Sequence, residues 1–68
     1  MIVVSIQLQY HPELAPCFFS ITEAEQTMTG YISGECVTWK DSAIWPLQID
    51  REIAEELILL KFATFLNH

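Results

Sequence analysis

The stretch IDREIAEELILLKFATFL, residues 49–66, decides the fold of this chain because it carries the signals of one long helix. The side chain of Asp50 can accept the unpaired backbone N–H groups of a first helical turn. Neither glycine nor proline interrupts the stretch, and its leucine, alanine, glutamate and lysine residues favour the helical conformation. The sequence therefore predicts a helix over residues 50–66 with Asp50 as its N-cap.

The apolar residues of this predicted helix lie on two of its sides. The side that we expect to face the core comprises Ile53, Leu57, Leu60 and Thr64, with Ala54, Ile58 and Phe65 beside them. In the second half of the helix, Leu59, Phe62 and Leu66 cluster on the opposite side. Because a sheet can cover only one side of a helix, the second apolar side needs a different cover.

Two arrangements can cover this second side. In one, a loop or the N-terminal strand folds over it and the chain is a monomer. In the other, it contacts a second copy of the chain or a different protein. The second arrangement is favoured because small domains bury only about 60% of their chain surface. We therefore predict a homodimer or another homo-oligomer, with an interface formed by Leu59, Phe62, Phe65 and Leu66.

The residues before the helix show the two-residue period of strands. Apolar and polar residues alternate over Ile2–Tyr10, which predicts a strand with one buried face. Residues 11–16 contain two prolines and are expected to form a loop. Cys17–Ile21 is apolar and rich in strand-forming residues, and we expect it to pair antiparallel with the first strand.

Two further segments complete the pattern before the helix. Residues 36–40 alternate cleanly and predict a strand between turns at residues 33–35 and 41–43. Residues 44–49 also alternate, but Pro46 has no N–H to donate to a neighbouring strand. This segment is therefore expected either as an edge strand or as an extended lead-in to the helix.

The sequence from residue 22 to residue 33 fits two structures. Thr22 and Glu25 have the spacing of a capping box, which would begin a short helix ending near Gly30. Alternatively, a turn at residues 24–26 joins two strands, the second of which runs over residues 27–33. The threonines and the tyrosine of this second part favour strands, so the hairpin is narrowly preferred.

These elements predict a small α+β fold. A small antiparallel β-sheet of three to five short strands carries one long C-terminal α-helix packed on one face, which gives two layers. The chain has 68 residues, enough for one modest core, and no internal repeat or linker divides it. We therefore expect a single compact domain over residues 1–68.

The charge balance excludes some classes of partner. Nine acidic and three basic side chains give a net charge of -6, and Lys40, Arg51 and Lys61 cannot form a phosphate-binding surface. We therefore expect no direct binding of nucleic acid.

The apolar run in the helix is shorter than the roughly 20 residues that cross a bilayer, so no membrane role is expected. The N-terminus lacks the features of an export signal, which predicts a cytoplasmic protein with free thiols at Cys17 and Cys36.

No motif for catalysis or for a cofactor occurs in the sequence. The paired spacings typical of zinc sites and of redox-active thiols are absent, and no serine lies in a recognisable nucleophile motif. We therefore expect no enzyme activity, no cofactor and no metal. A small thiol-dependent or metal-dependent enzyme that uses Cys17, Cys36 and His11 is the least favoured hypothesis.

The favoured hypothesis is a small acidic protein–protein interaction module, of the accessory, adaptor or inhibitor type, that self-associates through its helix. The large aromatic residues Trp39, Trp45 and Tyr31 are expected in the core. Alternatively, Trp39 or Trp45 stays exposed and anchors a partner, since tryptophan is enriched at interface hot spots. A second hypothesis is an acidic mimic of nucleic acid that blocks a nucleic-acid-binding protein. The carboxylates that would act in such a mimic are Glu23, Glu25, Glu52, Glu55 and Glu56.

Overall fold

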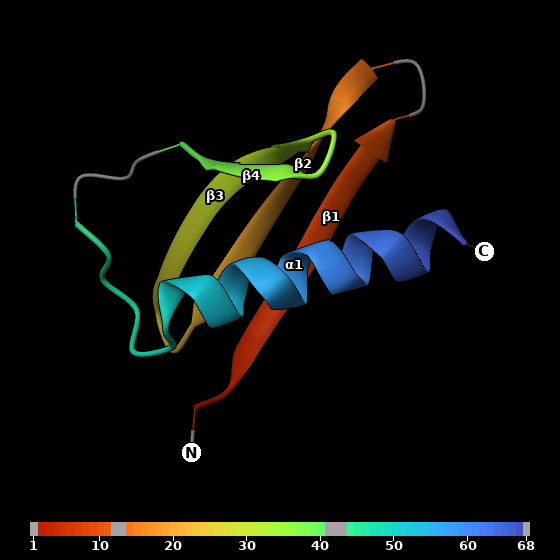
Figure 1. The fold of residues 1–68 in the computed structure, drawn as a ribbon. Coiled ribbons are helices and arrows are strands. Elements are labelled where there is room, and N and C mark those ends of the chain that lie inside the picture. Colours follow the sequence, from red (N-terminus) through yellow and green to blue (C-terminus); the bar gives the residue numbers. More distant parts are fainter. Residues whose placement is uncertain (1, 12–13, 41–43, 68) are drawn as a thin grey trace.

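The computed structural model describes residues 2–11, 14–40 and 44–67, which form four strands and one helix (Figure 1). The elements are β1 (Val4–His11), β2 (Leu14–Glu23), β3 (Gln26–Ser33), β4 (Cys36–Trp39) and α1 (Arg51–Leu66). The strands lie in chain order, and each is antiparallel to its neighbour. Helix α1 lies across one face of the sheet, which confirms the predicted two-layer α+β fold.

A tight hairpin joins β2 to β3 and decides between the two structures expected for residues 22–33. Glu23 pairs with Gln26, so only Ala24 and Glu25 form the loop, and Ala24 has a left-handed φ of 55°. Farther along the ladder, the hydroxyl oxygens of Thr22 and Thr27 lie 3.0 Å apart on facing strands. The hairpin is therefore confirmed, and the alternative of a short capped helix is wrong.

The alternation predicted for the first strand is confirmed, but β2 begins earlier than expected. Leu14 pairs with His11, so residues 14–16 belong to β2 and not to a loop. The pairing register shifts between Gln9 and His11, and Pro16 lies in this irregular part of the ladder. A proline is tolerated where the ladder is irregular, because no N–H is required there. The remaining part of the expected loop, residues 12–13, lies outside the described residues.

Residues 44–50 form no strand, so the edge-strand alternative is wrong and this segment is a lead-in to the helix. The carboxylate of Glu23, at the end of β2, accepts the backbone N–H of Gln48 at 2.7 Å and that of Ile49 at 2.9 Å. These two bonds attach the lead-in to the hairpin and set the point where the helix begins. The predicted turn at residues 33–35 is present between β3 and β4, whereas the one at 41–43 lies outside the described part of the chain.

The core lies between the sheet and α1. It is formed by the buried residues Cys17, Phe19, Ile21, Met28, Ile32, Trp39, Leu47, Ile49, Ala54 and Ile58. Gly30 lets β3 approach its neighbours closely, because a Cβ atom there would meet the carbonyl oxygen of Thr38 and lie 2.8 Å from the ring of Phe19. The helix contributes only two of the fully buried side chains, so much of its apolar surface is left for other contacts.

Helix α1 begins as predicted, but it is rotated about its axis relative to the predicted orientation. The Asp50 side chain accepts the N–H groups of Glu52 and Ile53, at 2.9 and 3.4 Å, which confirms it as the N-cap. The side that faces the sheet is marked by Ala54 and Ile58, both fully buried. The central stripe of the predicted core side is exposed at Ile53, Leu57 and Leu60, so that part of the prediction is wrong. The expected burial of Ala54 and Ile58 beside this stripe is confirmed.

A polar contact explains why the helix has this orientation. The indole N–H of Trp39, in β4, donates a 2.8 Å hydrogen bond to the carboxylate of Glu55. This bond turns the Glu55 side of α1 toward the sheet and brings Ala54 and Ile58 with it. Both sides of the helix are apolar, so hydrophobicity alone does not distinguish them, and a buried indole N–H needs its partner.

Candidate interaction surface

The outer face of α1, formed by Ile53, Leu57, Leu60 and Thr64, points away from the sheet. Ile53 is 51% exposed, Leu57 38% and Leu60 64%. The hydroxyl of Thr64 donates to the carbonyl oxygen of Leu60 at 3.0 Å, so its polar group is already satisfied within the helix. The outer face is therefore an apolar stripe in contact with solvent.

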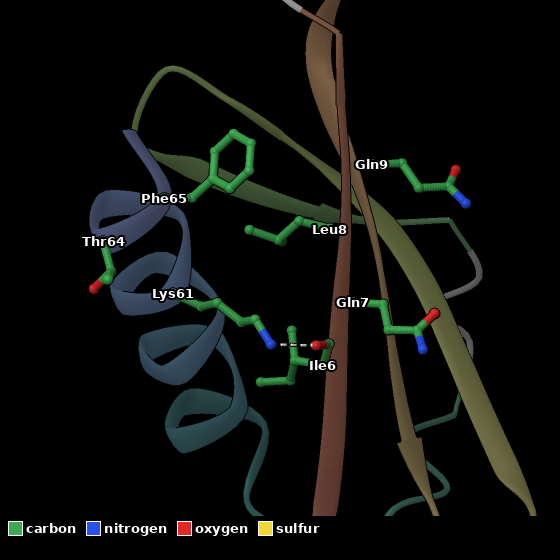
Figure 2. Close-up of a pocket in the computed structure, with 7 residues that line it drawn as sticks. All are labelled: Ile6, Gln7, Leu8, Gln9, Lys61, Thr64 and Phe65. Atoms are coloured by element: carbon green, nitrogen blue, oxygen red, sulfur yellow. Dashed lines mark hydrogen bonds between the residues drawn. The ribbon is translucent and has the colours of Figure 1, made fainter. Parts of the chain in front are cut away.

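An open groove, which we call the edge groove, runs between α1 and the strand β1. One part of it, of about 580 Å³, is lined by Ile6, Gln7, Leu8, Gln9, Lys61, Thr64 and Phe65. A second part continues along the same strand and is lined by Val4, Ile6, Leu57, Leu60, Lys61 and Thr64. Figure 2 shows Ile6 and Leu8 pointing toward the helix, while Gln7 and Gln9 point to the other side of the strand. The outer face of α1 thus continues into the edge groove.

Lys61 lies where the two parts of the edge groove meet. Its ammonium donates a 2.6 Å hydrogen bond to the backbone carbonyl oxygen of Ile6 (Figure 2). At one end of the groove, the ring of Tyr10 packs edge-on against Phe62 and Phe65, with ring centres 5.8 and 5.7 Å apart. These contacts fix the C-terminal half of α1 beside β1.

The four residues predicted to form the interface divide into two pairs. Leu59 and Phe62 are half-buried and pack against the core, whereas Phe65 and Leu66 are each about half exposed. The sequence therefore indicated correctly that the helix is apolar on two sides. It did not show that the more exposed side is the outer face, or that the outer face meets the free side of β1. Lys61, the one basic residue in the apolar half of the helix, could have indicated that the outer face meets the free side of β1.

The tryptophans proposed as partner contacts are used within the chain. Trp39 is buried, and its ring packs edge-on against Trp45 at a centre-to-centre distance of 4.8 Å. The indole N–H of Trp45 donates to the carbonyl oxygen of Ile49 at 2.7 Å, while that of Trp39 is bound to Glu55. Trp39 therefore offers no exposed anchor, and only part of the half-buried Trp45 can reach another molecule.

The carboxylates proposed for an acidic mimic do not form one free surface. Glu55 accepts bonds from Trp39 and, at 3.1 Å, from Arg51, and Glu23 binds the backbone of the lead-in. Glu25 lies in the hairpin loop beside the lead-in, whereas Glu52 and Glu56 lie on the helix, and all three are exposed. Two of the five carboxylates thus have structural partners, and the others are divided between two elements.

The two cysteines are free thiols in different surroundings. Cys17 is buried in the core and Cys36 is exposed, so they lie on opposite faces of the sheet. Burial raises the pKa of the Cys17 thiol, an effect partly offset by the backbone N–H of Gln9.

The side chain of His11, the third residue of the hypothetical thiol or metal site, is outside the described part. Among the residues whose positions are described, no group of three or more histidine, cysteine, aspartate or glutamate side chains could hold a metal ion.

Within the described ranges, no helix is both long enough and apolar enough to cross a membrane. Comparison with protein-family models, with curated proteins and with solved structures finds no match to this chain. Both the outer face of α1 and the edge groove are apolar surfaces that stay open to solvent.

Proposed function

We propose that this chain is a small protein–protein interaction module that binds, and self-associates, through the outer face of α1. The observation that carries the proposal is the exposure of Ile53, Leu57 and Leu60 on a helix whose other side packs on the sheet. Contiguous exposed apolar side chains of this kind mark interaction sites in small proteins. A contact that removes them from water gains about 25 cal/mol for each Å² of apolar surface.

The alternative of an acidic mimic has weaker support. A mimic needs carboxylates that are free to meet a basic partner, and both Glu23 and Glu55 already bind groups of their own chain. The proposal includes neither catalysis nor a cofactor.

We further propose that the protein acts in the cytoplasm, since both cysteines are free thiols, which is typical of a reducing compartment.

Replacement of Leu60 by glutamate tests the proposal. The side chain of Leu60 is 64% exposed, so Leu60→Glu leaves the core intact while placing a charge on the outer face. A matched control is Ile44→Glu, which introduces the same charge at an 81% exposed apolar residue of the lead-in. Circular dichroism checks that both variants fold.

Sedimentation velocity over a wide concentration series gives the result. We expect the wild-type mass to rise with concentration, Ile44→Glu to behave like wild type, and Leu60→Glu to associate at least tenfold more weakly, a change of about 1.4 kcal/mol. A wild-type chain that stays monomeric throughout the series, or a Leu60→Glu variant that associates normally, contradicts the proposal.

A further inference from the structure

The backbone of β1 has one free side, and the hairpin shows which residues face it. Glu23 and Gln26 flank a two-residue loop and therefore exchange backbone hydrogen bonds. In an antiparallel sheet these bonded pairs alternate, so the residues of β2 that bond to β1 are the partners of Ser5, Gln7 and Gln9. The N–H and C=O groups of the intervening residues, Val4, Ile6 and Leu8, consequently point away from β2.

Two observations agree with this assignment. β1 is the end strand of the sheet, and no other strand in the described ranges pairs with its second side. The carbonyl oxygen of Ile6 is also free to accept the ammonium of Lys61, as it would not be if it pointed into the ladder. The free backbone groups of β1 thus border the edge groove, next to the outer face of α1.

The exposed area of the chain is larger than that of a compact monomer. A folded protein of 7.8 kDa exposes about 4,400 Å² by the scaling of monomers. This chain exposes 5089 Å², about 700 Å² more than that scaling gives. Each partner in a stable interface buries roughly 800 Å². The excess is therefore close to what one side of a dimer interface would cover.

We propose that two copies of this chain pair their β1 strands antiparallel, so that the two sheets form one continuous sheet. This inference rests on the proposed self-association and specifies its geometry. Antiparallel pairing of identical strands places a two-fold axis perpendicular to the sheet, so both helices lie on the same face. Each outer face then meets the edge groove or the outer face of the other copy.

A second copy fits this surface because it covers two different features at once. The unpaired backbone N–H and C=O groups of Val4, Ile6 and Leu8 form hydrogen bonds with the same groups of the partner strand. The apolar outer face packs against the apolar surface of the other copy. Lys61 is compatible with the pairing, since a carbonyl oxygen has two lone pairs and Ile6 can accept a second hydrogen bond. The same surface patch serves on both sides, as a two-fold interface requires.

A pair of substitutions at Leu8 separates backbone pairing from side-chain contact. Leu8→Pro removes an N–H that faces the free side, and proline is tolerated at such positions of an edge strand. Leu8→Ala removes the same leucine side chain and keeps the N–H. In sedimentation velocity we expect Leu8→Pro to associate at least tenfold more weakly than Leu8→Ala, which loses the same side-chain contacts in the edge groove.

Amide hydrogen exchange measured by NMR provides a second readout that needs no variant. Exchange at Ile6 and Leu8 should slow at least tenfold between dilute and concentrated samples, whereas Gln7, whose N–H bonds to β2, should be protected in both. Association that survives Leu8→Pro, or that leaves the Ile6 and Leu8 amides unprotected, overturns the strand pairing but not the proposed function. A chain that remains monomeric at every concentration overturns both.

Discussion

Ala24 adopts a backbone conformation that an alanine side chain disfavours. Its φ of 55° lies in the left-handed region, where the Cβ atom crowds the following carbonyl oxygen at a cost of roughly 1–2 kcal/mol. We predict that Ala24→Gly raises the free energy of unfolding by about 1 kcal/mol, and the melting temperature by about 4–8 °C. Thermal denaturation followed by circular dichroism measures both changes.

Glu25 provides the control for this prediction, because it lies in the same loop without a positive φ. Glu25→Gly should give no gain, since a glycine there adds only freedom to the unfolded chain. Equal stabilisation by both substitutions would mean that loop flexibility, and not the conformation of Ala24, is responsible.

The two cysteines should differ in reactivity, because only the thiolate is a nucleophile and only Cys36 is exposed. At neutral pH, mass spectrometry after treatment with iodoacetamide should show one adduct, at Cys36. Cys17 should react only as fast as the protein unfolds. Labelling of Cys17 at the rate of Cys36 would contradict its burial in the core.

The raised pKa of Cys17 also predicts the direction of a pH effect. Its neutral thiol is favoured in the folded state, so the resulting stability is present below the ordinary pKa of a thiol. It is lost as the pH rises through the raised pKa, because the unfolded chain ionises first. Urea midpoints should therefore fall more steeply at alkaline pH in wild type than in Cys17→Ala.

At the scale of elements, the orientation of α1 can be measured by two isoleucine substitutions. Ile58→Ala should lower the free energy of unfolding by about 2–4 kcal/mol, because it removes a fully buried side chain. Ile53→Ala should change it by less than about 0.5 kcal/mol in a dilute, monomeric sample, because Ile53 lies on the outer face. Urea denaturation that gave the reverse order would support the orientation expected from the sequence.

The strands and the start of the helix could be predicted because their signals are local. Burial of one face of a strand produces alternation in the sequence, as in β1 and β4, and an N-cap such as Asp50 marks the first helical turn. The start of β2 was missed because Pro16 is typical of a loop. It lies in the strand where the ladder is irregular, which only the pairing with β1 reveals.

The orientation of the helix could not be predicted, because contacts between distant residues decide it. Trp39 and Glu55 are 16 positions apart, and Glu23 binds amides 25 and 26 positions away. The same limit applied to the candidate surface. The spacing of the leucines showed that the helix has two apolar faces. It did not show which of these faces would remain exposed beside the edge of β1.

At the scale of the whole molecule, the net charge of -6 opposes association of two copies. Salt screens this repulsion, and the proposed contacts are apolar or between backbone groups, which salt affects little. We predict that the dissociation constant of the dimer falls roughly severalfold as sodium chloride is raised from low to high concentration. Sedimentation equilibrium measures it. A steep weakening with salt would instead indicate an interface of opposite charges.

The order of strands in the sheet also has a consequence during synthesis. Each strand pairs with the one made just before it, so the whole ladder can form while α1 is still inside the ribosome. At about 5–20 residues per second, residues 40–66 take about one to five seconds to appear. During that interval the face later covered by Ala54 and Ile58 is bare, and a chaperone on the nascent chain can bind it.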